Sequence, residues 1–377
     1  MAVRVLQICA SLSSGGGVQT VLKNYYTYMN QEEYIFDFVV MGTEVGELEH
    51  WFESRGSRIY HVTPRSISFR RNTEELNQII KAGNYDVVHC HQDYKSLIAI
   101  ILAKIHGVKT RIVHAHQAFP KESVKLLIVR KLSTWLIKGF ANIFIGCGED
   151  AAKWLYGDRM LETGKAIVLN NAIELEKYAF SEEKRKRIRF ELGLDNKLVL
   201  GCVARITEVK NHRLMVDVFG KFHQRNDQTV LLLVGDGELM DEIKEYCKSL
   251  NLSESVIFLG ARSDVNELLS VMDVFLLTSR SEGVALVSIE VQANGLPMVL
   301  SPFVTRKVGL HRNVLFVPEK DYENTDDWCS IINKALQIGR LDDIEVLTQA
   351  GYDICQEAQK LEAIYASRKV MDSKWMS

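Results

Sequence analysis

The sequence predicts an α/β protein with two doubly wound parallel sheets, and three observations support this fold class. The chain has 377 residues, which is too many for one compact core. Short runs of Val, Ile and Leu that are apolar on both faces alternate with amphipathic helical stretches, as they do in buried parallel sheets. The alternation occurs in two separate series, so each half of the chain is expected to form its own domain.

Ten strands are expected. The first series covers residues 2–8, 36–41, 87–89, 111–115 and 143–145, and the second covers 199–204, 230–234, 256–259, 274–278 and 298–300. The charged stretch 174–189 lacks a strand pattern and marks the seam between the two series; we expect it to form a solvated helix. A last helix is expected within residues 353–370.

Composition excludes several classes of protein. The chain is 47% hydrophobic, has a formal charge of −2, and its longest apolar run, 97–103, is far too short to span a bilayer. The absence of a basic excess argues against nucleic acid as a partner. Seven scattered cysteines without a CxxC pair argue against disulfides and a zinc site. The amino terminus lacks the apolar core of a signal peptide, so a cytoplasmic location is expected.

A glycine-rich loop follows the first expected strand. Ser13 and Ser14 precede Gly15, Gly16 and Gly17, and a helix is expected to begin near Val18. Glycines let a backbone approach a ligand closely, and the free N–H groups of a helix start favour an anion. The spacing is not GxGxxG, so the loop can be an anion site or only a turn.

The first strand of the second series ends before two cations, Arg205 and Lys210. Ligands of such sheets bind beyond the carboxyl ends of the strands, where this pair could clamp a diphosphate. The alternative is two solvated surface cations. Gly235, Asp236 and Gly237 form a glycine turn at the end of the next strand.

Two glutamates mark the most specific motif. Glu282 follows a strand, Glu290 lies eight residues later in a helix, and Gly295-Leu296-Pro297 ends that helix. Carboxylates accept hydrogen bonds from vicinal hydroxyls, so this pair suits a ligand that carries two diols. Each could instead be a surface glutamate or a helix-capping carboxylate.

These motifs together resemble glycosyltransferase family 4, the retaining nucleotide-sugar enzymes of the GT-B fold. The resemblance covers nearly the whole chain. It is carried by the glycine loop with 18–20, the block 205–210, the turn 235–237 and the block 281–297. Residues 112–117 (IVHAHQ) and 169–174 (LNNAIE) are most similar to bacterial exopolysaccharide and capsule transferases. The chain departs from the family at Ala172, Glu174 and Val284, where Gly, Asp and Phe are common.

The resemblance implies two Rossmann-like domains that face each other across a catalytic cleft. Residues 1–172 would bind the acceptor, 173–350 would bind the nucleotide-sugar, and a terminal helix in 351–377 would return to the first domain. The resemblance also implies roles for single residues: Glu282 would bind donor-sugar hydroxyls, Glu290 would bind the ribose, and Arg205 and Lys210 would hold the diphosphate. Gly16 and Gly17 would approach the diphosphate from the other domain, and His116 would lie beside the transferring sugar. Arg262 and Ser263 would lie near the base, and the other residues expected at the donor are Asn171, Gly235, Gly283 and Val284.

No metal or other cofactor is expected. The chain has no D-x-D motif for a divalent cation, so two fixed cations would have to offset the charge of the departing diphosphate. His89, His91, His114 and His116 lie on or after two neighbouring strands without zinc-site spacing. For His116 we expect a role in the catalytic cleft, and for the other three a role in the core or behind the site.

Residues 121–140 mix five cations with large apolar side chains, among them Leu126, Leu127, Val129, Leu132, Trp135, Leu136 and Phe140. This stretch could rest on a membrane that carries a lipid-linked acceptor, which would place the protein on the inner face of the membrane, or it could be a core helix with basic edges.

The expected function is retaining, metal-independent transfer of a hexose or N-acetylhexosamine to a glycan or lipid-linked saccharide in surface polysaccharide synthesis. The donor is expected to be a nucleotide-diphosphate sugar, with uridine diphosphate as the leaving group. The alternatives are a non-catalytic GT-B subunit that activates a partner transferase and a UDP-sugar epimerase on the same fold.

Overall fold

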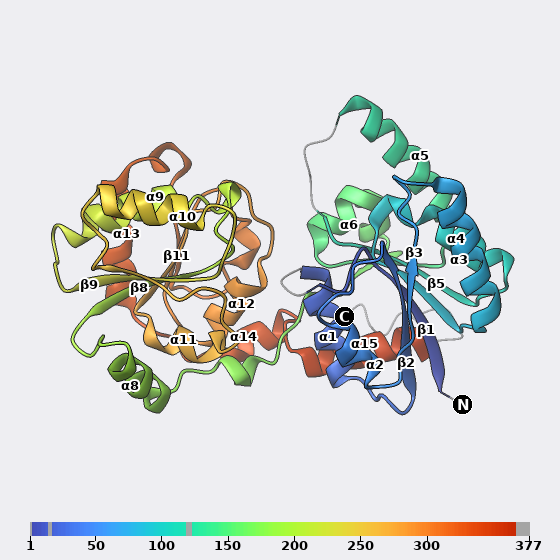
Figure 1. Ribbon diagram of the computed structural model, residues 1–377, viewed down its shortest axis with the longest axis horizontal. Helices are drawn as coiled ribbons and strands as arrows, with labels where there is room; N and C mark the ends of the chain where they lie inside the picture. The colour runs from blue at the N-terminus through green and yellow to red at the C-terminus, as the bar shows by residue number, and fades with distance from the viewer. Residues whose placement is uncertain (1, 14–16, 118–122, 367–377) are drawn as a thin grey trace. The chain divides into compact units, whose positions relative to one another are not determined.

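The computed structural model describes residues 2–13, 17–117 and 123–366, and the chain divides into two compact units (Figure 1). Unit 1 contains residues 1–172 and 354–377, and unit 2 contains residues 173–353. The chain returns to unit 1 between residues 353 and 354, three residues after the expected boundary between residues 350 and 351. The reason is that the amide of Ile173 donates to the carbonyl of Tyr352 at 3.0 Å, which keeps residues 351–353 with unit 2.

The sheet of unit 1 is parallel, with the strand order β3-β2-β1-β4-β5-β6-β7 in the described residues. Its strands are β1 (Val3–Ile8), β2 (Tyr34–Met41), β3 (Ile59–Val62), β4 (Val87–Cys90), β5 (Thr110–Ala115), β6 (Ile143–Gly146) and β7 (Ala166–Val168). The order changes direction at β1, so β1, β4 and β5 form the centre of the sheet. Their carboxyl ends are therefore where a ligand site is expected in this unit.

Helices cover both faces of this sheet. They are α1 (Gly17–Tyr28), α2 (Glu49–Glu53), α3 (Phe69–Gly83), η1 (Asp93–Ser96), α4 (Leu97–Ile105), α5 (Val124–Phe140), α6 (Glu149–Tyr156), α7 (Asp158–Glu162) and the terminal α15 (Ile354–Ala366). Helix α15 packs against α1, so the last described helix belongs to the same unit as the first. Ser123 caps the start of helix α5, because its side chain accepts a hydrogen bond from the amide of Leu126.

The sheet of unit 2 is also parallel, with the order β10-β9-β8-β11-β12-β13. Its strands are β8 (Leu198–Val203), β9 (Thr229–Val234), β10 (Val256–Phe258), β11 (Val274–Leu277), β12 (Met298–Leu300) and β13 (Val314–Phe316). Its helices are η2 (Leu175–Tyr178), α8 (Glu182–Glu191), η3 (Glu208–Lys210), α9 (His212–His223), α10 (Met240–Ser249), α11 (Val265–Val271), α12 (Leu286–Ala293), η4 (Arg306–Val308), η5 (Glu319–Asp321), α13 (Thr325–Ile338) and α14 (Ile344–Gln349).

The two faces of the second sheet belong to two different apolar clusters. Leu200, Leu231 and Val274 pack into one cluster, whereas Val199 and Val230 pack into the other. Successive side chains of a strand point to opposite faces, and both faces of this sheet are covered by helices. Strands buried on both faces need continuous apolar runs, which is why the parallel sheet could be predicted.

All ten expected strands are present, and the doubly wound parallel fold is confirmed. Three further strands, β3, β7 and β13, were not expected. Each lies at the edge of its sheet and is only partly buried. An edge strand has a neighbour on one side only, so its apolar pattern is weaker.

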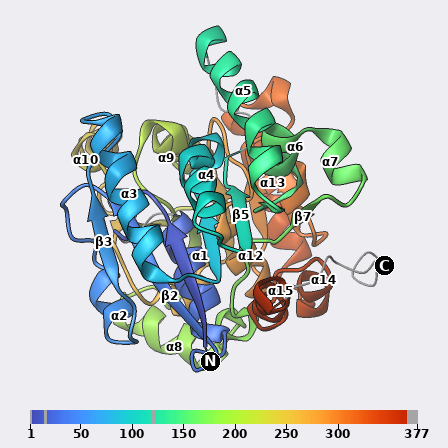
Figure 2. The ribbon, with the colours of Figure 1, turned by 90° about the vertical axis from the view of Figure 1, so that its right-hand side faces the viewer.

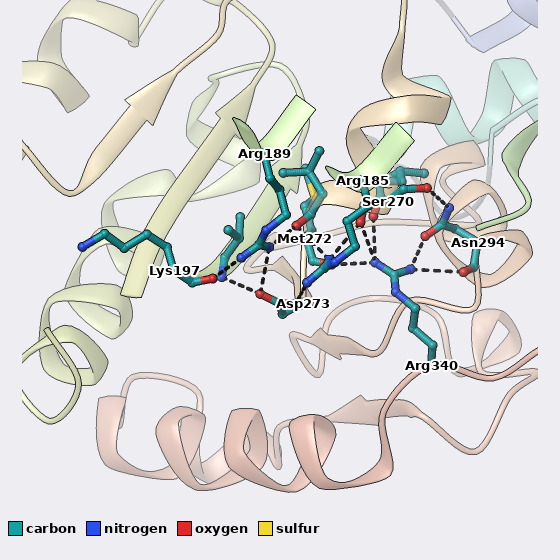
Figure 3. A network of polar contacts seen from close by, with 11 residues as sticks. Arg185, Arg189, Lys197, Ser270, Met272, Asp273, Asn294 and Arg340 are labelled. Atoms are coloured by element: carbon teal, nitrogen blue, oxygen red, sulfur yellow. Dashed lines mark hydrogen bonds and ion pairs between the residues drawn. The ribbon is translucent and has the colours of Figure 1, made fainter. Parts of the chain in front are cut away.

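The charged stretch at the seam forms helix α8 as expected, but the prediction that it is solvated is wrong for two of its arginines. Arg185 and Arg189 are largely covered by the rest of unit 2 and form ion pairs with Asp273 at 2.6 and 3.4 Å (Figure 3). Arg340 joins them at the carboxyl end of α11, where it donates to the carbonyl groups of Leu269 and Met272. Burial lowers the pKa of Arg340 to about 9, so the guanidinium stays charged at neutral pH.

This arginine network has a structural role. Guanidinium groups satisfy the last carbonyl groups of α11 and interact favourably with the negative end of its dipole. Asp273 also accepts from the amide of Val199 at 2.8 Å, which connects the network to the first strand of unit 2. The network therefore anchors the segment that enters unit 2 to the sheet.

Helix α5 extends beyond the other helices of unit 1 in both views (Figures 1 and 2). Only Thr134 and Ile137 of this helix are buried. The interpretation of this stretch as a core helix is therefore wrong for the part that the structure describes; Lys121 lies outside the described residues. Among the described helices, none is both long enough and apolar enough to cross a membrane.

Candidate active site

The loop after β8 places two cations at the carboxyl edge of the second sheet. Arg205 has a mostly exposed guanidinium, with the carboxylate of Glu238 3.9 Å away. Lys210 ends η3 and keeps only 21% of its side chain exposed. Asn211 then adopts a left-handed backbone with φ of 51° and leads into α9. Within the described residues, no hydrogen bond or ion pair joins the two cations to each other.

A cavity of about 600 Å³ lies beside Arg205. It is lined by Val203, Ala204, Arg205, Val234, Gly235, Asp236, Gly237, Ala261, Arg262 and Val265. Gly235 and Gly237 are required by packing, because a Cβ atom on either would lie 2.0 or 2.3 Å from a carbonyl oxygen of the 204–206 segment. These glycines let two loops cross closely and so shape the cavity wall. Three of the predicted donor residues, Arg205, Gly235 and Arg262, share this cavity.

Arg262 is already held by its own loop. Its guanidinium makes two parallel hydrogen bonds to Asp264, at 2.8 and 2.7 Å, and this contact raises the pKa of Arg262. The neighbouring Ser263 is exposed. Asp264 therefore orients the Arg262 side chain at the cavity rim, where its remaining N–H groups can face a ligand.

The second pair of predicted residues meets directly. The ammonium group of Lys210 donates to the carboxylate of Glu282 in a short ion pair, and both side chains are about four-fifths buried. The backbone of Glu282 is fixed on both sides: its amide donates to the carbonyl of Phe303, and its carbonyl accepts from the amide of Thr305, each at 3.1 Å. The residue predicted for a diphosphate and the one predicted for sugar hydroxyls thus neutralise each other here.

Beyond Glu282, the chain turns into α12. Gly283 is exposed, and Val284 packs against the core of unit 2. Glu290, the fifth residue of α12, is partly buried, and desolvation raises the pKa of its carboxyl group. The phenol of Tyr178 donates to this carboxylate at 3.0 Å. Tyr178 was not predicted, because it lies 112 residues away in η2 and carries no recognisable motif.

Unit 1 holds a second cavity of about 770 Å³ at the carboxyl ends of β1, β4 and β5. It is lined by Ala10, Gly17, Val18, Met41, Pro64, Arg65, Ser66, His91, Gln92, Asp93, Tyr94, Lys95, His116, Gln117 and Asn171. Three predicted residues, Gly17, His116 and Asn171, therefore share one cavity. Gly16 lies outside the described residues.

Several polar residues of this cavity were not predicted, and Asp93 and Arg65 are two of them. Asp93 follows β4 with a left-handed φ of 50°, and one carboxylate oxygen accepts from the amide of His116 at 2.8 Å. Burial raises the pKa of Asp93 to about 6. Arg65 donates to the side chain of Asn72 at 3.1 Å and to the carbonyl of Lys95. The alternation His89-x-His91-x-Asp93 at the carboxyl end of a buried strand was a signal that could have found Asp93.

Four imidazoles cluster behind and along this cavity. His91 and His116 make an N···N contact of 2.8 Å, and His89 and His114 one of 3.2 Å. Desolvation lowers the pKa of every ring in the cluster, to about 3 for His89 and about 4 for His116. All four rings are therefore neutral at physiological pH.

The same cluster raises the question of a metal, because ring nitrogens of His89, His91 and His114 lie within 4.8 Å of one another. A metal needs a lone pair from each facing nitrogen. In the short His–His contacts, however, two nitrogens face each other at hydrogen-bond distance, which requires a proton between them. The described geometry thus fits hydrogen-bonded neutral rings.

Two doubly wound parallel α/β units are the architecture of the GT-B class of glycosyltransferases. Sequence comparison agrees: residues 15–177 match Glycosyltransferase Family 4, and residues 184–329 match Glycosyl transferases group 1. EpsF of Bacillus subtilis (strain 168), which carries the name of a glycosyltransferase, is 30% identical over 376 residues, or 96% of each chain. The chain belongs to glycosyltransferase family 4.

Two further similarities are informative. An Escherichia coli protein named UDP-Gal:alpha-D-GlcNAc-diphosphoundecaprenol alpha-1,3-galactosyltransferase is 30% identical over 300 residues, or 76% of each chain. The crystal structure of Anabaena HepE in complex with UDP superposes with a TM-score of 0.71 at 18% identity, covering 97% of this chain and 100% of that one. The first supports membership of the family, and the second supports the fold.

Proposed function

We propose that the protein is a retaining glycosyltransferase that moves a hexose or N-acetylhexosamine from a UDP-sugar to a glycan or lipid-linked saccharide in the synthesis of a surface polysaccharide. The observation that carries the proposal is the ion pair between Lys210 and Glu282, together with the cation Arg205, which precedes Lys210 by five residues after β8. This part of unit 2 offers cations for a diphosphate and a carboxylate for sugar hydroxyls. The names of the Escherichia coli relative and of the HepE complex support uridine diphosphate as the carrier.

Donor binding has to rearrange this pair. A diphosphate competes with Glu282 for the ammonium group of Lys210, and sugar hydroxyls replace the ammonium group on the carboxylate. The pair keeps both groups from being buried without a partner before the donor arrives, which would be costly for charges that are four-fifths covered. Arg205 needs no such exchange, because its contact with Glu238 is long and exposed.

Every bond and proton of the proposed reaction can be accounted for without a metal ion. The bond between the anomeric carbon and the diphosphate oxygen breaks, and an acceptor oxygen forms a bond to the same carbon on the same face. The acceptor proton passes to the departing diphosphate. Arg205 and Lys210 offset the charge that develops on the leaving group, and fixed charges at such a position are usually the largest catalytic contribution. Activity should therefore survive excess EDTA; loss with rescue by manganese would contradict this part of the proposal.

Helix α5 is the proposed contact with the membrane that carries a lipid-linked acceptor. Its exposed large apolar side chains are Val124, Leu126, Ile128, Val129, Leu132 and Trp135. Lys125 and Lys131 are exposed on the same helix. Apolar side chains that enter the headgroup region, next to lysines that meet anionic lipids, are typical of interfacial helices.

The donor proposal is tested by a thermal-shift screen of nucleoside diphosphates and their sugars, followed by transfer assays. A donor at 100 times its dissociation constant should stabilise the protein by about 2.7 kcal/mol. The anomeric proton coupling of the product decides between retention and inversion. Donor incubated alone separates the alternatives: a new sugar without acceptor would indicate an epimerase, and binding without turnover would indicate a non-catalytic subunit.

The membrane proposal is tested by flotation with vesicles that contain anionic lipid. Wild-type protein should float with these vesicles, and replacement of both Leu132 and Trp135 by Ser should abolish flotation. A matched control replaces the exposed Phe190 of unit 2 by Ser. Equal flotation of all three proteins, or of none, would show that α5 does not bind the membrane.

A further inference from the structure

Six side chains of unit 1 form one continuous chain of hydrogen bonds. The heavy-atom distances along it are 2.8, 2.8, 3.0, 2.8 and 3.2 Å, and the residues follow the order His116, His91, Gln7, Tyr365, His89 and His114. They come from or directly follow β1, β4 and β5, except for Tyr365, which α15 contributes. Only the first end, at His116 and His91, lines the cavity of unit 1.

The middle of the chain sets the direction of every hydrogen bond in it. The amide nitrogen of Gln7 can only donate, and it donates to the phenol oxygen of Tyr365. The phenol then donates its own proton to Nδ1 of His89. The amide oxygen of Gln7 can only accept, so His91 must donate from Nε2. One amide therefore determines the protonated nitrogen of the rings on both sides.

The same reasoning fixes the donor and the acceptor of the hydrogen bonds at both ends of the chain of six residues. Because Nε2 of His91 carries the proton, its Nδ1 must accept, and His116 donates from Nε2. The Nδ1 atom of His116 consequently keeps its lone pair. On the other branch, His89 donates from Nε2 to Nδ1 of His114, whose own Nε2 is buried without a hydrogen-bond partner among the described residues. All four rings are neutral, and all four carry the proton on Nε2.

We propose that Gln7 and Tyr365 are positioning residues, which hold His116 as a neutral ring with Nδ1 as an acceptor, so that the cavity of unit 1 binds a sugar hydroxyl through His116. The proposal rests on the proposed function for the identity of the ligand, but not for the direction of the chain. Asp93 supports it, because its carboxylate fixes the amide of His116 at 2.8 Å. Because burial lowers the pKa of these rings, His91 and His116 do not take up a second proton at neutral pH.

Only one other arrangement satisfies the same heavy atoms. If the amide of Gln7 were rotated by half a turn, Tyr365 would donate to Gln7, and Gln7 would donate to His91. Every ring proton would then move to Nδ1, and His116 would present an N–H donor to the cavity. A donor at that atom would favour a ligand oxygen without a proton, such as a phosphate oxygen. The two arrangements therefore differ in the chemistry of the ligand that they accept.

The decisive experiment is nitrogen NMR of the full-length protein labelled with ¹⁵N-histidine, with the four rings assigned through single substitutions. Long-range couplings report which ring nitrogen is protonated. We expect protonated Nε2 and bare Nδ1 in His89, His91, His114 and His116 at pH 7.5. Protonation of Nδ1 in His116 would overturn the proposal. This measurement needs no substrate, so its result is independent of whether the protein proves to be a UDP-sugar transferase.

Two variants test the role of Tyr365. Tyr365→Phe removes the acceptor for Gln7 and the donor for His89, so the amide can turn and His116 should become a mixture of both tautomers. The catalytic efficiency kcat/KM should fall about 10-fold, mainly through KM. Tyr34→Phe is the matched control, because the Tyr34 phenol lies next to Tyr365 and donates to the carbonyl of Glu362 on the same helix. Tyr34 is not a member of the six-residue chain of hydrogen bonds. An unchanged His116 spectrum in Tyr365→Phe would overturn the proposal.

The metal interpretation is a further outcome of the same experiment. Zinc added to the labelled protein should leave the four ring spectra unchanged if the chain holds. A joint change of His89, His91 and His114 at stoichiometric zinc would show a metal site in place of the chain. If Tyr365→Phe does not fold, the wild-type tautomers and the zinc titration still decide the matter.

Discussion

The carboxyl edges of the two sheets are built from the same topology, but their predicted site residues differ in chemistry. In unit 2, the edge holds ionised groups, Arg205, Lys210 and Glu282, and the two buried ones neutralise each other. In unit 1, the edge also carries charged side chains, such as Arg65 and Asp93, but its predicted site residue, His116, is an imidazole that burial keeps neutral. The contrast shows that a doubly wound sheet fixes where a ligand binds, whereas local burial and pairing decide whether the site is charged.

This contrast fits a division of labour in the proposed reaction. A leaving diphosphate needs compensating cations, and a sugar that is only positioned needs neutral donors and acceptors. Charged groups tolerate four-fifths burial only as a pair, whereas neutral rings can be stacked in a row with centroids 4.1 to 5.3 Å apart. Removing a charge from the first site should therefore have larger effects than disturbing one hydrogen bond in either site.

The largest effect is expected for Lys210→Ala. The substitution removes a cation from the leaving group and leaves Glu282 without its partner, so kcat should fall about 100- to 1,000-fold. The measurement is the steady-state rate of UDP release with acceptor present. Lys248→Ala is a control on the same unit, because Lys248 is exposed and forms only a 3.8 Å contact with Glu245. Similar rates for both variants would remove the proposed role of the charged edge.

The two glutamates of unit 2 should separate binding from catalysis. Glu282→Gln should mainly lower kcat, by about 10- to 100-fold, because the sugar gains positive character as its bond to phosphate breaks. Glu290→Gln should mainly raise the KM of the donor, since the ribose is the same in substrate and transition state. Calorimetry with UDP provides the check: affinity should fall for the Glu290 variant and hold for the Glu282 variant. The reverse order would contradict the assignment.

Acid should weaken unit 1 more than unit 2. The folded pKa values of His89 and His116, about 3 and 4, lie below the unfolded value of 6.5. The unfolded chain therefore binds more protons below pH 6.5, and the stability present above that pH is lost as the pH falls towards the folded values, by at most about 1.4 kcal/mol per pH unit for each ring. Unit 2 has one comparable ring, His212, with a pKa of about 4.

Hydrogen exchange measured at pH 7.5 and 5.5 tests this difference. After correction for the intrinsic rates, amides of β4 and β5 should lose protection more strongly than amides of β8 and β11. Protonation of Asp93 changes the stability in the opposite direction from protonation of the histidines. Its folded pKa is about 6, so uptake of a proton between pH 6 and 4 favours the folded state. Asp93→Asn should therefore steepen the loss in unit 1. Equal losses in both sheets would show that the imidazoles are not the acid-sensitive groups.

The sequence alone could predict the central strands and which polar residues follow their ends, but not the contacts of those residues. Continuous apolar runs identify strands buried on both faces, whereas the partly exposed edges β3, β7 and β13 gave no such signal. Polar residues beyond strand ends pointed to Arg205, Glu282 and His116, because parallel strands end at one edge. The pairing of residues 72 apart, as in Lys210 with Glu282, depends on tertiary packing.

The chain of hydrogen bonds in unit 1 also depends on tertiary packing and could not be predicted from the sequence. Gln7 and Tyr365 are 358 residues apart, and neither belongs to a motif. A glutamine in a buried strand and a tyrosine in an apolar helix face both suggest ordinary packing. Only the return of α15 to the first unit brings them together and makes them polar partners of the histidines.

The smallest effect is expected for Tyr178→Phe, which removes one hydrogen bond from the charged site without removing a charge. The Tyr178 phenol orients the carboxylate of Glu290 at 3.0 Å, and a hydrogen bond of this kind contributes about 0.5–1.5 kcal/mol. The Kd for UDP should rise about 2- to 10-fold in calorimetry, with kcat unchanged, because the ribose does not change during the reaction. Tyr246→Phe is the matched control, since the Tyr246 phenol also donates to a carboxylate, that of Asp217, on helices α9 and α10 rather than at the predicted ribose contact. A fall in kcat for Tyr178→Phe, or an equal loss of affinity in both variants, would mean that Glu290 is not oriented for the ribose by Tyr178.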